Sequence, residues 1–254
     1  MYSVWAAKQR LKIHLLVGGI VLVALVVYIY VNLRQPSSCF DHKRNQDEIG
    51  IDCGGTCSLL CRSQTGELNT LWVQTFEVSQ GIWSALAYIE NPNFNAYATD
   101  IPYRFTLYDR NGIAILKREG STYILGEPVI PIFVGQIAVG SRTPYRATFE
   151  WLHDPVWQKL VSRYQVAFEE QQIQGDAGRP EVTVVIKNTE PTELRDIEVV
   201  AIVYDKDQNA IAVSQTYVDI LQPREKRLLT FSWPHPFTAT PVRVELLPRI
   251  PMQR

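Results

Sequence analysis

Hydrophobic positions follow two different patterns along this chain. Residues 13–33 form one apolar run without Asp, Glu, Lys or Arg, and Lys12 and Arg34 bracket it. At about 1.5 Å of rise per residue, a helix of roughly 20 residues spans a hydrocarbon core of about 30 Å. The run therefore predicts a transmembrane helix over 13–33.

From Leu68 onward, apolar and polar residues alternate in short runs rich in Val, Ile, Tyr, Phe and Thr, with turn residues between them. This alternation is typical of antiparallel strands with one face buried and the other in water. The Asn111-Gly112 pair tolerates the left-handed angles of a hairpin turn. A short helical stretch is expected only near 155–164. The pattern predicts an all-β body.

Four short segments recur in the same order in the two halves of this body. The pairs are 87–91 with 184–188, 105–109 with 201–205, 113–115 with 211–213, and 148–151 with 230–233. The second copy is shorter between its third and fourth matches, so we expect an insertion in the first copy around 119–141. We interpret the halves as two tandem β-sandwich domains.

The residues shared by the halves each have a structural explanation. Asn91 and Asn188 end a strand, where an amide can satisfy free backbone groups. Tyr108 and Tyr204 are expected to bury a ring while the hydroxyl finds a partner. Trp151 and Trp233 are expected to close the last strand of each copy. For other aromatic residues, such as Trp83, Phe94 and Tyr97, the alternative to a structural role is an exposed contact surface.

The predicted organisation is all-β after one helix. Its parts are a cytoplasmic N-terminus over 1–12, the transmembrane helix over 13–33, a cysteine-rich segment over 36–64, a first β-sandwich over 67–155, a linker over 156–180 and a second β-sandwich over 181–250.

The charges beside the apolar run predict its orientation. Lys8, Arg10 and Lys12 precede it, and Lys and Arg near a transmembrane end stay preferentially on the cytoplasmic side. We expect a single-pass protein of the cell membrane with its body outside the cytoplasm. A cleaved signal peptide is the alternative, but the run is long for one and no small-x-small cleavage site follows it.

Composition narrows the function classes. The net charge is -1, with 25 Lys and Arg against 26 Asp and Glu, so no basic surface for nucleic acid is expected. The 4 histidines are scattered, and there is no G-x-S-x-G, H-E-x-x-H or glycine-rich phosphate loop. We therefore expect no catalytic residues and no nucleic-acid partner.

The four cysteines cluster at Cys39, Cys53, Cys57 and Cys61. An even number in a short stretch on the oxidising side of a membrane indicates two disulfides, and three pairings are open. The C-x3-C-x3-C spacing differs from the C-x2-C pairs of zinc ribbons.

Oxygen-bearing side chains are dense inside this cysteine loop. They are Asp41, Asn45, Asp47, Glu48 and Asp52, and Gly54-Gly55 follows them. Calcium takes six to eight hard oxygen ligands, so a calcium site is one hypothesis. For the cysteines, the alternatives to disulfides are a zinc or iron-sulfur site or free thiols, and no other cofactor is expected. The structural alternative is a solvated loop whose Asp and Asn cap turns while the glycines supply positive φ.

Two motifs resemble known families. The run C-x-D-x3-N-x2-E-x3-D-C-G-G-x-C-x3-C over 39–61 resembles a cysteine motif that recurs in secreted and cell-surface bacterial proteins, which implies an extracytoplasmic location. The run over 105–109 reads F-T-L-Y-D and resembles the fibronectin-like or immunoglobulin-like sandwich family named for its F-x-L-Y-D motif. In the second copy Ala201 and Val203 depart from that motif. The family has no shared catalytic residues and implies a binding or spacer module outside the cell.

These observations favour a non-enzymatic, membrane-anchored envelope protein whose sandwiches act as a binding or spacer module. Its expected partners are the lipid bilayer, through the helix, and an envelope protein or a glycan; the sequence identifies no binding residues. One alternative is a subunit of a larger membrane or secretion assembly, since Gly18-Gly19 permits close helix approach. The other is a calcium-dependent adhesion or sensor module that uses loop 41–52.

Overall fold

The protein is described from a computed structural model, which covers residues 2–33, 38–45, 47–175 and 178–253. The chain divides into two compact units, residues 1–57 and 58–254. The elements are α1 (Tyr2–Leu33), the 3-10 turn η1 (Arg62–Gln64), β1 (Asn69–Ser79), β2 (Ile82–Glu90), β3 (Ala96–Tyr108), β4 (Ala114–Ile124), β5 (Val129–Ala138), β6 (Arg146–Trp151), β7 (Gln158–Lys159), β8 (Val166–Gln174), β9 (Glu181–Asn188), β10 (Leu194–Tyr204), β11 (Ala210–Leu221), β12 (Lys226–Ser232) and β13 (Arg243–Arg249).

The N-terminal unit contains a single long apolar helix. α1 has 32 residues, and its stretch Lys8–Val31 is long and apolar enough to cross a membrane, with no part of it buried. A membrane anchor and a signal sequence share these features. The helix predicted over 13–33 is confirmed, and it begins earlier because residues 2–12 contain neither Gly nor Pro to end it.

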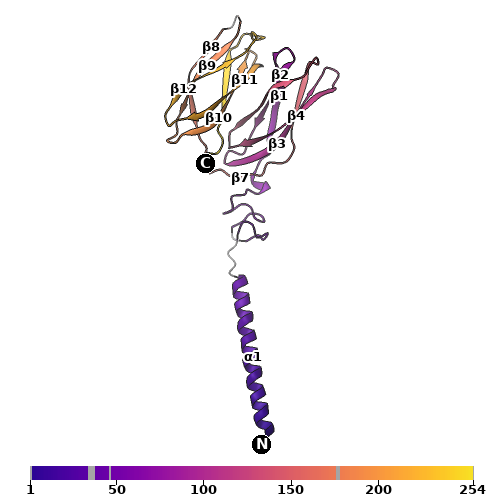
Figure 1. The fold of residues 1–254 in the computed structure, drawn as a ribbon, viewed down its shortest axis with the longest axis vertical. Coiled ribbons are helices and arrows are strands. Elements are labelled where there is room, and N and C mark those ends of the chain that lie inside the picture. The colour runs from indigo at the N-terminus through magenta and orange to yellow at the C-terminus, as the bar shows by residue number, and fades with distance from the viewer. Residues whose placement is uncertain (1, 34–37, 46, 176–177, 254) are drawn as a thin grey trace. The chain divides into compact units, whose positions relative to one another are not determined.

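The first sandwich packs two antiparallel sheets face to face (Figure 1). One sheet has the order β1-β2-β5, and the other has the order β4-β3-β6 with β7 paired to the start of β3. Alternate residues of the strands point inward, so that Leu107, Phe105 and Ile132 are almost completely buried. Residues 105–108 of the FTLYD segment end β3, with Phe105 and Leu107 in this core, and Asp109 follows the strand.

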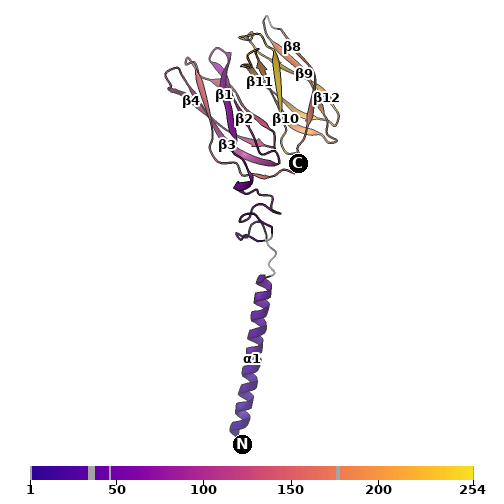
Figure 2. The ribbon, with the colours of Figure 1, turned by 180° about the vertical axis from the view of Figure 1, so that it is seen from behind.

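The second sandwich has sheets of order β8-β9-β12 and β11-β10-β13 (Figure 2). Its core is built mainly from aliphatic side chains of β9 and β10, and Val184, Ile186 and Val199 are fully buried. The all-β prediction with two sandwiches after one apolar helix is therefore confirmed.

The two sandwiches share one strand order. In chain order, β1-β2-β5 and β4-β3-β6 correspond to β8-β9-β12 and β11-β10-β13. One of the four sequence matches is out of register with this order, because 148–151 lies on β6 whereas 230–233 lies at β12, the counterpart of β5. The predicted insertion around 119–141 is therefore wrong, since that stretch holds the end of β4 and the whole of β5, which has β12 as its counterpart in the second sandwich. Trp233 directly follows β12, and β13 is the last strand of that sandwich, so the expectation that Trp233 closes the last strand is wrong.

The predicted linker and helix are also corrected. Residues 156–180 contain β7 and the whole of β8, which forms an edge of the second sandwich. No helix forms over 155–164: the backbone N–H of Lys159 donates to Ser58 O at 2.8 Å, and that of Leu160 to Asn95 O at 2.9 Å. Pairing with distant strands satisfies these donors better than an isolated short helix, which is marginal in water.

A third apolar cluster joins the sandwiches to each other. It contains buried residues of β1 and β2, such as Phe76 and Leu86, and buried residues of β10 and β11, such as Val200 and Val213. The outer face of one sheet in each sandwich is therefore covered by the other sandwich. Residues 58–254 form one compact unit for this reason.

Candidate functional site

The cysteine-rich segment is fully oxidised. Cys39 and Cys57 form a disulfide that brings their Cα atoms to 5.6 Å across a sequence separation of 18. Cys53 and Cys61 are also disulfide-bonded, and no described cysteine is free. The prediction of two disulfides is confirmed.

Two carboxylates of the loop accept hydrogen bonds from its own backbone. Asp52 Oδ1 accepts from the N–H groups of Asp41 at 3.0 Å and His42 at 3.2 Å. Asp41 accepts from Lys43 N at 2.9 Å and from the Asn45 side-chain amide at 2.7 Å. The hydrogen bond from Asn45 lowers the pKa of Asp41. Asp41, Asn45 and Asp52 therefore hold turns, as carboxylates and amides do elsewhere.

Glu48 is the buried acid of the segment, 6% exposed. One carboxylate oxygen accepts from Asn45 N at 3.2 Å, and the other lies 3.2 Å from Cys57 Sγ. Among described residues, Cys39, Glu48 and Cys57 have ligand atoms within 4.8 Å of one another. Both sulfurs belong to a disulfide, and metals bind the thiolate form, so this group is not a metal site.

The calcium hypothesis stays a prediction for Asp41, Asn45, Asp47, Glu48 and Asp52. The structure brings four of them together through hydrogen bonds to the loop itself, while Asp47 is exposed. An oxygen that already accepts an N–H bond has less capacity for a cation.

The D-C-G-G run has a steric explanation. Asp52, Gly54 and Gly55 all have positive φ, at 55°, 74° and 57°. A Cβ on Gly55 would lie 1.8 Å from the carbonyl oxygen of Asp47. The backbone therefore accepts only glycine there, and the motif forms the turn that closes the disulfide loop.

We expect Gly55→Ala to destabilise this segment by about 2 kcal/mol or more, from left-handed strain together with the clash at Asp47. Hydrogen exchange of the Cys57 amide, which donates to Gly54 O at 2.9 Å, reports the local opening. Gly112→Ala is the control: its φ is 75°, but nothing lies within 4 Å of the added Cβ. An equal loss for both variants would contradict the steric explanation.

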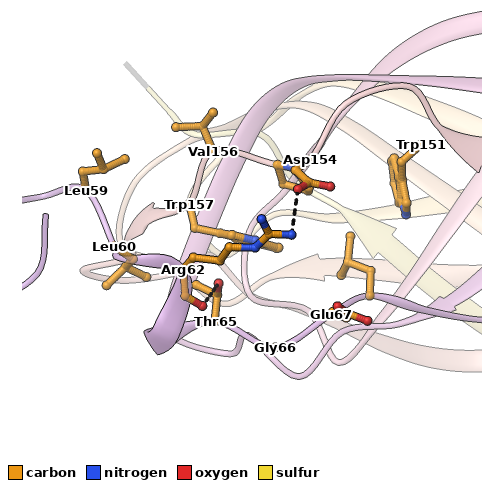
Figure 3. A pocket seen from close by; sticks show the side chains of 12 residues that line it. Leu59, Leu60, Arg62, Thr65, Gly66, Glu67, Trp151, Asp154, Val156 and Trp157 are labelled. Carbon is orange, nitrogen blue, oxygen red and sulfur yellow. Dashed lines mark hydrogen bonds and ion pairs between the residues drawn. The ribbon is translucent and has the colours of Figure 1, made fainter. Parts of the chain in front are cut away.

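A hollow of the C-terminal unit lies beside the residues with which that unit starts (Figure 3). Its volume is about 570 Å³. Leu60, Trp157 and Val156 supply apolar walls, and Arg62 pairs with Asp154 at 3.3 Å. The side chains of this ion pair are 90% and 86% exposed, so water screens it and it contributes little to stability.

The described residues that line this pocket are not paired as a nucleophile and a base. Thr65 Oγ1 donates to the carbonyl of Arg62, its hydrogen-bond partner in the described structure, rather than to a base. Trp151 Nε1 is buried without a hydrogen-bond partner among the described residues, and so it is not open to a ligand in the hollow. Sequence reasoning missed this pocket, because its walls come from two segments distant in the chain, 59–68 and 151–157.

The contact between the two sandwiches, formed by the third apolar cluster and the polar residues around it, is called the seam below. It contains a hydrogen-bonded group that the sequence analysis did not predict. The Glu245 carboxylate accepts from the hydroxyls of Tyr88 in the first sandwich and Tyr204 in the second, both at 2.9 Å. Burial, followed by the bond to Glu245, raises the pKa of Tyr88 to about 12, and burial also raises that of Tyr204. Both hydroxyls therefore stay protonated donors at neutral pH.

Arg249, the last residue of β13, is 5% exposed and reaches into the first sandwich. Its guanidinium donates to Thr122 Oγ1 at 2.8 Å, to Pro131 O at 3.4 Å and to the carbonyl of Tyr123. It also lies over the Tyr123 ring, 4.6 Å from the centroid. Hydrogen bonds from a buried cation are among the stronger ones, so this side chain fixes one sandwich against the other.

Asn91, Asn188 and Tyr204 have the structural roles expected of them, whereas Tyr108 is only partly buried, with the Arg146 guanidinium 4.9 Å from its ring centroid. The Asn91 amide donates to Glu127 O at 2.8 Å, and that of Asn188 to Gln222 O at 3.1 Å. The carbonyl of Glu127 lies in the turn before β5, and that of Gln222 lies in the turn before its counterpart, β12. Tyr204 finds its hydroxyl partner at the seam. The three aromatic residues of the expected contact surface differ: Phe94 is 56% exposed, whereas Trp83 and Tyr97 are partly buried.

The aspartates that follow the two tyrosines also correspond. Asp109 Oδ1 accepts from Ile113 N at 2.9 Å, and Asp205 Oδ1 from Asn209 N at 2.9 Å. Each carboxylate therefore closes the hairpin between the third and fourth strands of its half, β3–β4 and β10–β11.

Comparison with known proteins gives no family. The sequence matches no protein-family model and no curated protein. Among solved structures, red sea bream transglutaminase is similar at 12% identity and a TM-score of 0.23, over 71% of this chain and 29% of that chain. The Amycolatopsis orientalis exo-chitosanase CsxA is similar at 12% identity and a TM-score of 0.21, over 65% of this chain and 25% of that chain. Bacteroides uniformis β-glucuronidase is similar at 14% identity and a TM-score of 0.20, over 64% of this chain and 22% of that chain. The chain spans less than a third of the length of these chains, and such loose superpositions say nothing about its activity.

Proposed function

We propose that this protein is a non-enzymatic envelope protein, anchored by α1, that carries its two sandwiches outside the cytoplasm as one rigid spacer and binding module. The observation that carries the proposal is the continuous seam between the sandwiches. Two domains on a flexible linker would move independently, whereas here an apolar cluster and Arg249 join them. A spacer needs this stiffness to keep a surface at a set place.

Three further features support the anchored location. The apolar helix is exposed along Lys8–Val31, the cysteines are oxidised, and the body is rich in sandwich strands. Disulfides persist in oxidising compartments outside the cytoplasm. The matching strand orders and hairpin aspartates support tandem copies of one unit, and the FTLYD segment supports the F-x-L-Y-D family as their class.

The location is tested with the full chain carrying an epitope tag at each end, produced in a bacterial cell. Protease added to spheroplasts, whose outer layers have been removed, is expected to remove the C-terminal tag and to leave the N-terminal tag protected in the membrane fraction. Loss of the N-terminal tag from the mature chain before proteolysis would indicate a cleaved signal peptide. A C-terminal tag that only lysis exposes would place the body in the cytoplasm. Either result would overturn the proposal.

The rigidity is tested separately, by a distance measurement between spin labels at two exposed positions. Ile113 on the first sandwich and Leu228 on the second are 58% and 62% exposed. Labels introduced there as non-natural amino acids, so that the disulfides stay intact, are expected to give one narrow distance distribution in the full chain. A broad distribution would show that the sandwiches move independently and would remove the spacer role.

A further inference from the structure

The chain enters its C-terminal unit at one end of the first sandwich. Strand β3 runs the length of this sandwich, and its first residue, Ala96, pairs with Lys159 of β7. The Lys159 N–H donates to Ser58 O at 2.8 Å, and the Leu60 N–H donates to Trp157 O at 2.9 Å. Residues 58–60 are therefore fixed beside the Ala96 end of β3.

Three unusually exposed apolar side chains lie at this same end. Val161 is 99% exposed, Val156 is 65% exposed and Phe94 is 56% exposed. Phe94 and Val161 line one shallow hollow, and Val156 lines the pocket beside Trp157. Hydrogen bonds to neighbouring strands hold the loops that carry them. Apolar side chains grouped at one exposed site mark a contact surface more often than scattered ones do.

The covalent tether limits how far this end can move from the end of α1. Residues 34–57 connect Leu33 to Ser58, and the Cys39–Cys57 disulfide shortens most of that stretch to a Cα separation of 5.6 Å. Whatever its conformation, the remaining chain cannot reach beyond about 30 Å. A helix end at a membrane interface would therefore keep the entry end of the body within that distance of the lipid headgroups.

Charge at this end is balanced rather than one-sided. Three basic residues (Arg62, Lys159 and Arg163) and three acidic residues (Glu67, Glu127 and Asp154) lie in or beside these loops. Attraction to anionic lipid would need an excess of basic groups. The exposed apolar side chains are therefore the feature that fits a lipid surface, whose interfacial region accepts such side chains.

We propose that Phe94, Val156 and Val161 insert into the interfacial region of the bilayer that holds α1, so that the body rests on the membrane through the entry end of its first sandwich. This inference rests on the proposed membrane anchoring. In this arrangement one end of the first sandwich is held at the membrane, and the surfaces at the opposite end of β3 face away from the lipid.

The opposite end supplies a matched control. Ile113 follows β3 and is 58% exposed, close to the value for Phe94. At about 3.3 Å per residue, the 13 residues of β3 place it roughly 40 Å from Phe94. An equally apolar, equally exposed side chain is therefore present where the proposal expects no lipid.

The experiment uses the full chain in phosphatidylcholine nanodiscs, with methyl-labelled Val, Leu and Ile and with a spin label on the upper acyl chain of the lipid. The Val156 and Val161 methyl signals are expected to broaden, as are those of Leu22 in α1, whereas Ile113 and Leu228 signals stay sharp. In a Phe94→Ser, Val156→Ser, Val161→Ser variant, the methyls of Leu59 and Leu60 serve as reporters, and their broadening is expected to fall about tenfold. The single change Ile113→Ser, at the opposite end of β3, should leave this broadening unchanged.

Each outcome bears on one proposal. Broadened Leu22 signals with sharp Val161 signals would overturn this inference and leave the anchoring intact. Sharp Leu22 signals would show that α1 is not in the bilayer and would overturn the anchoring itself. Val161 signals that shift with protein concentration, and not with the spin label, would assign the surface to a second copy and overturn the lipid contact.

Discussion

Truncating Phe105 to alanine is expected to lower the free energy of unfolding by about 3–5 kcal/mol, the usual cost of a Phe-to-Ala change in a packed core. Phe105 is fully buried and lies opposite Phe149 across the β3–β6 pair. Its ring centroid lies 5.8 Å from that of Tyr103 and 5.1 Å from that of Phe149, so the change removes two aromatic contacts and leaves a cavity. Denaturant unfolding of the full chain in detergent, followed by tryptophan fluorescence, measures the loss.

Phe40→Ala is the control, because that phenylalanine is 84% exposed. We expect it to change stability by no more than about 0.5 kcal/mol. A loss below about 1 kcal/mol for Phe105→Ala would mean that the first residue of the FTLYD segment is not a core residue. The structural reading of that motif would then be wrong.

Replacing Arg249 with alanine is expected to lower stability by about 2–4 kcal/mol and to separate the unfolding of the two sandwiches. The change leaves the carbonyls of Pro131 and Tyr123 and the hydroxyl of Thr122 without their charged donor. It also removes the guanidinium from the Tyr123 ring. Unfolding monitored by fluorescence and by hydrogen exchange in each sandwich is expected to change from one shared transition to two.

Two further variants isolate the cause. Arg195 is half exposed on β10, so Arg195→Ala is expected to leave both stability and the shared transition unchanged. Arg249→Lys keeps the charge but loses the planar fork of donors, and it should recover only part of the lost stability. If Arg249→Ala still unfolds in one transition at its original midpoint, the apolar cluster alone couples the sandwiches and the arginine is dispensable.

The local features of the chain could be predicted because each depends on neighbouring residues. An uncharged apolar run forms a helix whatever follows it, since all its backbone bonds are internal. Alternation identifies strands, and the carboxylate of Asp109 closes a hairpin with an amide only four residues later. The turn-forming role of Asp52 and Gly55 was the structural alternative already open for the cysteine loop.

The errors of prediction fall where a distant partner decides the structure. Residues 155–164 looked helical by local spacing, but their backbone donors pair with Ser58 and Asn95. β8 looked like a linker because its polar residues lie on an edge strand, whose pattern is weak when only one neighbour, β9, pairs with it. The match of 148–151 with 230–233 compared two strands that hold different places in their sheets.

The sequence by itself determined the apolar helix, the all-β body, the clustered cysteines and most of the strands, because the spacing of apolar residues and the turn chemistry are local. Only the tertiary structure decided that the sandwiches form one unit, that Glu245 and Arg249 join them, and that Phe94, Val156 and Val161 share one end of β3. The physical reason is that burial between two faces, and a hydrogen bond across them, depend on which surfaces meet, and residues far apart in the chain supply those surfaces.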